Sequence, residues 1–503
     1  MIIWHVLLAT CITLATGEPA RPNVCKYLQC MKSSQTVANH TVIKYNKTIW
    51  EAHNLNENVF DFRAWNWTEL DDLAHEGDAL VEVIFNGLDI VQIDSLDGHD
   101  NVMSLNLDGN GIQNVEKNAF GQFRRLINLS LRANMISAID HGYFYYDSKI
   151  ENLDISQNVI TTLVGFKDLT WASLIYLNAS HNHIEHVTNQ LVKLDKLEWV
   201  DLSYNRIART DGPLMLPRNL RDCILNNNNL TIWPFDSVPG RLRHLCIGFN
   251  LLNSTKPASG LRKLDLSHNR LAVFCSECFP NLEELDISGN YLDTVPDWSA
   301  SMDISPLKKI SFNRMPFLRV IKNNSFSKTA NLKEIEISTC PELANIEENA
   351  FTSLTQLQKL DLSYNGLQQV HENIVHWNRI KHGVNLQGNP FRCDCSMQWF
   401  LDRVISEMLS DRELHALFPD LRCTSPSIYK NQLLVRLTIH DNVLCRTTRM
   451  INEAGMVQII TSDEDHLVEK VILCCLIVAN IVTLFYLVYL KNKRQYKIIP
   501  IYS

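Results

Sequence analysis

The stretch from residue 126 to residue 136, LINLSLRANMI, decides the fold of this chain. It has apolar residues at its first, fourth, sixth and eleventh positions and an asparagine, Asn134, at the ninth, in the pattern L-x-x-L-x-L-x-x-N-x-L. The same pattern returns in residues 150–160, IENLDISQNVI, and in residues 357–367, LQKLDLSYNGL. A pattern that recurs every 20 to 50 residues or so indicates a solenoid of stacked units, none of which can bury its apolar face alone.

The ninth position of the pattern can be followed along the chain, and it marks thirteen units spaced 19 to 25 residues apart. The markers are Leu88, Asn110, Asn134, Asn158, Asn182, Asn205, Asn228, Asn250, Asn269, Asn290, Met315, Cys340 and Asn365. The L-x-L alternation predicts a short strand with one face inward, and the asparagine amide can satisfy backbone groups in the buried turn, which would otherwise cost about 1–3 kcal/mol each. Where Met315 and Cys340 replace asparagine, we expect an irregular bend between residues 312 and 343.

This pattern is identified as that of the leucine-rich-repeat family, and the resemblance covers residues 78 to 391 or so. It implies an α/β leucine-rich-repeat solenoid that is curved, with parallel strands on its concave face and a disulfide cap. The apolar residues 471–490 add one expected transmembrane helix. The expected divisions are a signal peptide (1–17), an N-terminal cap region (18–77), about thirteen repeats (78–388), a C-terminal cysteine cap (389–445), a stalk (446–470), a transmembrane helix (471–490) and a cytoplasmic tail (491–503).

Cysteines mark both ends of the predicted solenoid. The C-terminal set resembles the cysteine cap of extracellular leucine-rich-repeat proteins, which implies the pairs Cys393 with Cys423 and Cys395 with Cys445; the sequence alone leaves three connectivities open. A zinc site would need a reducing compartment or a closer second cysteine pair. At the other end only two cysteines are present, and we expect a Cys25–Cys30 loop followed by an irregular, glycosylated segment.

Besides Cys340, four cysteines lie within the repeats. Cys275 and Cys278 stand in a connection between units, where a local disulfide is favoured over redox catalysis. Cys223 takes an inward strand position and is expected to be a buried thiol. Cys246 takes the outward fifth position, so two readings stay open: burial against a neighbour, or a bond to another chain.

Two apolar stretches predict the membrane topology. Residues 2–16 resemble a secretory signal, with an uncleaved anchor as the alternative. Residues 471–490 carry no charge, and at about 1.5 Å per residue they reach the roughly 30 Å of a hydrocarbon core. Basic residues follow this span and acidic ones precede it, so the positive-inside rule predicts a single-pass type I protein at the plasma membrane, with an extracellular ectodomain and a cytosolic C-terminus. Asn480 within the span is either tolerated there or bonds a neighbouring helix in a dimer.

Eight N-x-Ser/Thr sequons precede the predicted span, and this one-sided placement agrees with a lumenal path. They predict glycosylation at Asn39, Asn46, Asn66, Asn128, Asn178, Asn229, Asn253 and Asn323.

The repeat register also predicts which side chains form the concave wall, namely positions two, three, five, seven and eight of each unit. Position five carries an acidic row, for which a structural reading is favoured: Asp154, Asp201, Asp265, Asp286, Glu336 and Asp361. Because large exposed aromatic residues often anchor interfaces, we expect a protein partner to bind an aromatic patch on this wall. The patch consists of Tyr176, Trp199, His181, Tyr204 and Phe249. A glycan on Asn178 would crowd Tyr176. Basic pairs on the same wall are read as part of a mixed, solvated surface.

Function can be narrowed by class. The chain has no phosphate-binding glycine loop, no H-E-x-x-H and no G-x-S-x-G, so we expect no enzyme, no cofactor and no metal site. A net charge of −8 gives no reason to expect nucleic acid as a partner. A cell-surface receptor or co-receptor that binds a protein ligand fits these features, and a cell-adhesion protein is the alternative. The tail at 491–503 is too short for a signalling domain, so signalling would pass through a partner.

The two-cysteine N-terminus, the Cys393-Asp394-Cys395 cap and the minimal tail together resemble insect proteins, in particular mosquito leucine-rich immune proteins of the transmembrane kind. That resemblance implies a role in innate immune recognition. The coiled-coil segment of those proteins is not evident, because only residues 446–470 separate the cap from the predicted span and they lack sustained heptads.

Overall fold

A computed structural model describes the backbone of residues 40–44, 59–60, 80–84 and 90–93, and then residues 102–406, 421–438 and 443–446. Within 102–406 the gaps are 122, 144–147, 168–170, 188, 209–211, 297, 299–304, 378–379 and 381–382. The predicted signal peptide, membrane span and tail, and all of the predicted stalk except Arg446, therefore lie outside the described residues. Within the described part, the structure contains no helix with the length and apolar character that a membrane crossing requires.

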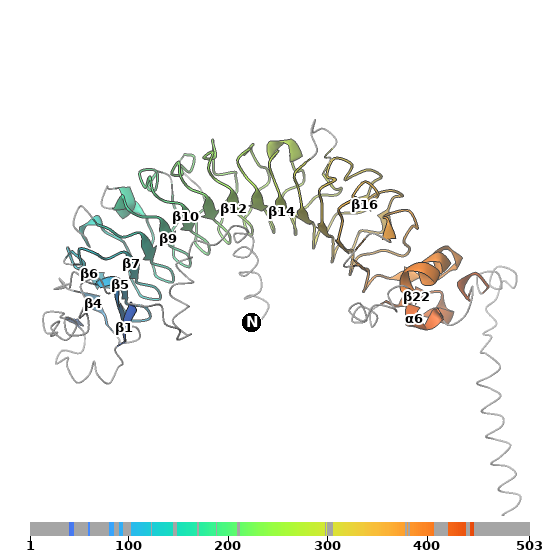
Figure 1. Cartoon of the computed structure of the whole chain (residues 1–503), viewed down its shortest axis with the longest axis horizontal. Coiled ribbons are helices and arrows are strands. Elements are labelled where there is room, and N and C mark those ends of the chain that lie inside the picture. Colours follow the sequence, from blue (N-terminus) through green and yellow to red (C-terminus); the bar gives the residue numbers. More distant parts are fainter. Residues whose placement is uncertain are drawn as a thin grey trace, which may run out of the picture.

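A parallel sheet of fifteen strands runs through the described part of the chain. In sheet order, which is also chain order, the strands are β1 (His40–Lys44), β3 (Leu80–Ile84), β5 (Val102–Asn106), β7 (Asn128–Ser130), β8 (Asn152–Asp154), β9 (Tyr176–Asn178), β10 (Trp199–Asp201), β11 (Asp222–Ile224), β12 (His244–Cys246), β13 (Lys263–Asp265), β14 (Glu284–Asp286), β15 (Lys309–Ser311), β17 (Glu334–Glu336), β19 (Lys359–Asp361) and β20 (Val384–Asn385). Successive strands follow one another along an open arch (Figure 1). This arrangement confirms the predicted curved solenoid with a parallel sheet.

Each of the thirteen predicted units contributes one strand, from β3 to β19. The sheet extends one strand further at each end. β1 lies inside the segment for which the sequence predicts an irregular cap, and it pairs with β3, the strand of the first repeat. At the other end β20 pairs with β19, and Asn389 behind it donates from Nδ2 to the carbonyls of Leu362 and Leu386, both at 2.8 Å. Asn389 thus acts as another ninth-position asparagine at the start of the predicted cap.

The outer side of the arch contains short strands and 3-10 helices where the predicted α/β class implied α-helices, and that part of the prediction is wrong. The short strands are β2 (Val59–Phe60), β4 (Gln92–Ile93), β6 (Asn114–Val115), β16 (Val320–Ile321) and β18 (Asn345–Ile346), and the 3-10 helices are η3 (His141–Tyr143), η4 (Val164–Lys167) and η6 (Ser276–Cys278). In the described part, α-helix occurs only after the last repeat, at residues 398–399 and 406, at α6 (Leu434–Leu437) and at residues 443–446. After the eleven-residue motif, a unit of 19 to 25 residues leaves 8 to 14 residues for the return segment. Because this segment must also contain the turns into and out of the strands, it has little room for a helix of average length, about eleven residues.

The ninth-position asparagines connect the units, and Asn158 is a representative one. Its Nδ2 donates to the carbonyl of Leu131 in the preceding unit at 2.9 Å and to that of Ile155 in its own unit at 3.1 Å. Its Oδ1 accepts from the backbone N–H of Ile136 at 3.0 Å. Because Asn158 is buried, these bonds satisfy backbone groups that water cannot reach.

The unit around Met315 and Cys340 is more regular than the sequence predicts. β15, β17 and β19 pair in unbroken parallel register, so the expected bend between residues 312 and 343 is not found. The Cys340 thiol takes over part of the asparagine's role: it accepts from the Met315 N–H at 3.4 Å and donates to the Phe312 carbonyl at 3.2 Å. Met315 itself is fully buried and contributes packing.

The C-terminal end of the solenoid is closed by a small disulfide-bonded unit. It contains β21 (Phe391–Arg392), η8 (Cys395–Met397), the π-helix η9 (Phe400–Ile405), β22 (Cys423–Ser425), η11 (Ser427–Tyr429) and α6. Disulfides join Cys393 to Cys423 and Cys395 to Cys445, the pairs that the family resemblance implies. Cys275 and Cys278 are also bonded to each other. The predicted Cys25–Cys30 loop lies outside the described residues.

Candidate binding face

The strand register places equivalent positions of neighbouring units side by side, so each position forms a row along the sheet. At position three the row runs from Tyr176 to Trp199, Asp222 and His244. At position five it runs through Asp201, Ile224, Cys246 and Asp265. The residue between these positions, such as Val200 in β10, is buried in the core. Positions three and five therefore share the opposite face, which we call the concave wall, as the sequence predicts.

An apolar cluster lies on the concave wall across β10, β11 and β12. Ile224 and Cys246 interrupt the polar fifth-position row; both are buried, and Trp199 packs against them. Tyr176 continues the cluster on β9, with its ring centroid 6.4 Å from that of Trp199. Cys246 is disulfide-bonded, and its partner is outside the described residues. The sequence placed Tyr176 and Trp199 together but did not indicate that Ile224 packs against Trp199.

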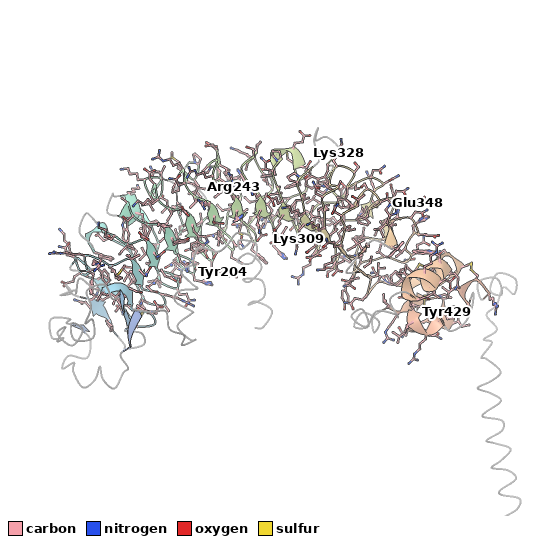
Figure 2. All side chains as sticks on the ribbon, viewed as in Figure 1. Tyr204, Arg243, Lys309, Lys328, Glu348 and Tyr429 are labelled. Atoms are coloured by element: carbon pink, nitrogen blue, oxygen red, sulfur yellow. A yellow bond between two sulfur atoms is a disulfide. The ribbon has the colours of Figure 1, made fainter. Side chains whose placement is uncertain are left out.

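Stacked rings form a second row, at position eight. The rings of His181 and Tyr204 stack with centroids 4.2 Å apart, and those of Phe249 and His268 stack at the same distance. Figure 2 shows Tyr204 on the inner side of the arch, together with Lys309, whereas Lys328 and Glu348 lie on the outer side. Three of the five predicted patch residues, His181, Tyr204 and Phe249, thus belong to this row. His268 belongs to it as well, although the sequence interpretation missed it.

The backbone fixes these rings. In each of thirteen successive turns from Gly109 to Gly388, the residue at position eight has the left-handed backbone conformation, with a positive φ. Its N–H donates to the seventh-position carbonyl of the next unit, as Tyr204 does to Asn226 at 2.9 Å, and the positive φ then turns the chain out of the sheet. The left-handed region is costly for residues with a Cβ, so glycine or asparagine is common there. Gly109, Gly289, Gly388 and Asn227 at this position were the sequence signal for it.

The acidic row at position five has a structural role. In β8, β10, β13, β14 and β19 the aspartate accepts a hydrogen bond from the backbone N–H of the seventh-position serine at 2.8–2.9 Å. Burial raises the pKa of Asp201 to about 6, and the nearby Asp154 carboxylate adds to the rise. Burial likewise raises the pKa of Asp154, Asp265 and Asp286. The bonds agree with the structural reading that the sequence favoured.

From β11 to β19 the concave wall carries polar contacts between neighbouring strands. In the third-position row Asp222 is hydrogen-bonded to His244, Lys263 forms an ion pair with Glu284 at 3.0 Å, and Lys309 forms one with Glu334 at 3.3 Å. In the second-position row Glu283 pairs with Arg262 at 3.5 Å and with Lys308 at 2.6 Å. Each predicted basic pair thus has carboxylates beside it, which agrees with the mixed, solvated surface. We call the part of the wall from β13 to β19 the ion-paired half, and the part that carries Tyr176, His181, Trp199 and Tyr204 the aromatic half; the aromatic half has the Glu198–Arg221 pair, at 3.8 Å, at its edge.

The five sequons within the described residues differ in accessibility. Asn178 is buried in β9, and Asn128 is half-buried in β7. Asn229, Asn253 and Asn323 are exposed and lie outside the strands. Asn39, Asn46 and Asn66 are outside the described residues.

Two free thiols, Cys223 and Cys340, are buried in the described part of the chain. Burial raises the pKa of both, that of Cys340 to about 11, so neither is a reactive thiolate. The buried thiol predicted at Cys223 is confirmed. Within the same described residues, no group of three or more histidine, cysteine or acidic side chains could hold a metal ion.

Two family models match parts of the chain. The model described as "Leucine rich repeat" matches residues 100–160, and the one described as "Leucine Rich repeats (2 copies)" matches residues 259–300.

Curated relatives match about a third of the chain. Lumican of Rattus norvegicus is 30% identical over 182 residues, which cover 34% of this chain and 48% of lumican. Fibromodulin of Mus musculus is 32% identical over 170 residues, which cover 32% of this chain and 42% of fibromodulin. The chain thus spans less than half the length of these relatives. Among solved structures, the TLR13–ssRNA13 complex is similar with a TM-score of 0.54 and 18% identity, covering 78% of this chain and 64% of that one, a likeness of fold. The repeat models and the curated relatives together support the leucine-rich-repeat family for this chain.

Proposed function

We propose that this chain is a cell-surface receptor or co-receptor that binds a protein partner through the aromatic half of its concave wall. The observation that carries the proposal is the grouping of rings there: Trp199 packs over the buried Ile224 and Cys246, the ring of Tyr176 lies against that of Trp199, and His181 and Tyr204 form a stacked pair. Aromatic side chains over a dry base are typical of the few residues that supply most of the binding energy in an interface.

The rings are also held before any partner binds. Stacking and the left-handed backbone fix Tyr204, and packing on Ile224 fixes Trp199. Ordering a flexible side chain on binding costs about 0.5–1.5 kcal/mol, and a ring that is already fixed avoids much of this cost. The ion-paired half of the wall is less suited to be the centre of an interface, because its charges would have to lose water on binding.

The sequence supplies the cellular part of the proposal. The apolar residues 471–490 with basic residues after them support a type I anchor at the plasma membrane. The resemblance to mosquito leucine-rich immune proteins supports a role in innate immune recognition. A cell-adhesion protein is the second candidate, because the same wall could meet a protein on another cell.

Proximity labelling on cells that display the full chain tests the proposal. We expect Trp199→Ala to lower labelling of the partner at least tenfold, whereas Phe317→Ala leaves it unchanged. Phe317 is a matched control because it is 49% exposed, pairs with the ring of Tyr291, and lies outside the strands. Equal labelling by the two variants would contradict the proposed site. Clustering of displaying cells with cells that lack the chain would favour adhesion.

A further inference from the structure

We propose that N-linked glycans attach to this protein at Asn229, Asn253 and Asn323 and that Asn178 carries none, which leaves the centre of the concave wall bare. This inference rests on the secretory route in the proposed function. The transfer joins asparagine Nδ2 to the first carbon of an oligosaccharide, breaks the bond from that carbon to a lipid pyrophosphate, and releases one proton from the amide.

The Asn178 side chain belongs to the fifth-position row of the concave wall, between Asp154 and Asp201. It is only 8% exposed, and its Nδ2 donates to Asp154 Oδ2 at 3.2 Å. Its Oδ1 accepts from the N–H of Ser180 at 3.1 Å and from the Ser180 hydroxyl at 2.8 Å. The hydroxyl that completes the sequon is itself buried. A sugar on Nδ2 would have to leave through the space that neighbouring side chains fill.

Because the transfer acts on the chain as it is synthesised, the unfolded Asn178 can be reached. A chain modified there could not rebuild this row, since buried polar groups without partners cost about 1–3 kcal/mol each. Folded, exported molecules are therefore those in which Asn178 escaped modification.

The other three asparagines are exposed and stand outside the long sheet. Asn229 follows β11, Asn253 follows β12, and Asn323 follows β16. β16 pairs with β18 in a separate sheet, which lies toward the outer side of the arch in Figure 1. Glycans at these sites can extend into solvent without displacing packed side chains. Asn128 stands on β7, two strands before β9 in the sheet, so its state does not decide whether the centre of the wall is bare.

The experiment uses the full chain expressed in animal cells, extracted in its folded form and treated with peptide N-glycosidase in H₂¹⁸O. The enzyme converts each glycosylated asparagine to an ¹⁸O-labelled aspartate, which mass spectrometry locates. We expect the label at Asn229, Asn253 and Asn323 and none at Asn178. As a matched pair, Asn229→Gln should increase gel mobility by one glycan, and Asn178→Gln should leave it unchanged.

Label at Asn178 together with the three exposed sites would overturn this assignment and leave the secretory route intact. Absence of label at one exposed site would overturn the assignment there. Absence of label at every site would overturn both this inference and the secretory route in the proposed function.

Discussion

The imidazole of His181 and the phenol ring of Tyr204 stack with their centroids 4.2 Å apart and their planes 7° from parallel. The two residues come from successive units, and both have φ of 54°. The left-handed turn at position eight thus does two things: it takes the chain out of the sheet, and it holds rings of neighbouring units against one another on the concave wall.

Two substitutions at Tyr204 measure the free-energy cost of its positive φ. Both Tyr204→Ala and Tyr204→Gly remove the stacked ring, but glycine adopts a positive φ without the steric cost of a Cβ, about 1 kcal/mol. We therefore expect the Gly variant to be the more stable of the two by about that amount in urea unfolding of the purified protein. An Ala variant that equals or exceeds the Gly variant would show that the positive φ costs nothing at this position.

The buried ninth-position asparagines, which we call the asparagine ladder, are expected to stabilise the fold, and substitution of Asn158 tests this. Asn158→Ala removes one acceptor and a doubly bonded donor from a buried turn, which leaves the Leu131 and Ile155 carbonyls and the Ile136 N–H with fewer partners. The two carbonyls keep bonds from Asn134 and Asn182, so only the Ile136 N–H is left unpaired. At about 1–3 kcal/mol for a buried group without a partner, we expect a loss of that size in the free energy of unfolding. Asn229→Ala is the control, since Asn229 is exposed in the adjacent turn position of another unit. Similar losses for the two variants would contradict the role of the ladder.

The repeat, its register and the concave wall could be predicted from the sequence because each rests on local periodicity. The L-x-L alternation fixes which side chains face inward, and Tyr176 and Trp199 were placed side by side on that basis. The convex side could not be predicted equally well, because the connections vary in length and composition and so contain little periodicity. The α-helices implied there are replaced by 3-10 turns and short strands.

Contacts between units were the other part that the sequence did not provide. The burial of Ile224 and Cys246 beneath Trp199 depends on three strands meeting in space, and the pairing of Phe249 with His268 depends on a backbone conformation that only the recurrent glycines hinted at. The regular sheet through Met315 and Cys340 was missed because a thiol can bond the backbone in place of an amide.

The buried acidic row makes stability depend on pH. Burial raises the folded-state pKa of Asp201 to about 6, above its ordinary value of 3.8, so the charged form is destabilising. The stabilising contribution of protonated Asp201 is therefore greatest below pH 4 or so and is lost as pH rises through about 6. Asp201→Asn keeps an acceptor for the Ser203 N–H and removes the charge. In thermal unfolding we expect this variant to be more stable than the wild type at pH 8, by an amount on the order of 1 kcal/mol, and the difference to narrow at pH 5. A difference that is the same at both pH values would contradict the assigned pKa.

The cap disulfide Cys393–Cys423 should add more to the free energy of unfolding than the disulfide Cys275–Cys278, which lies between units. Cys393 and Cys423 close a loop of 30 residues, whereas Cys275 and Cys278 are separated by three. In the chain-entropy model, losing the first bond costs about 3.5 kcal/mol and losing the second about 1.5 kcal/mol. We expect the Cys393→Ser, Cys423→Ser double variant to unfold at clearly lower urea concentration than the Cys275→Ser, Cys278→Ser double variant. The opposite order would contradict a stabilising role for the cap.

Site-specific photo-crosslinking on living cells is the most direct test of whether a protein partner binds the aromatic half of the concave wall. A photoreactive amino acid replaces Tyr204, on the inner side of the arch, or Lys328, on the outer side, in the full-length chain (Figure 2). The account predicts a discrete protein adduct from position 204 that disappears when Trp199→Ala is added, and no such adduct from position 328. An adduct from position 328 alone, or one from position 204 that persists without Trp199, would contradict a partner bound on the aromatic half of the concave wall.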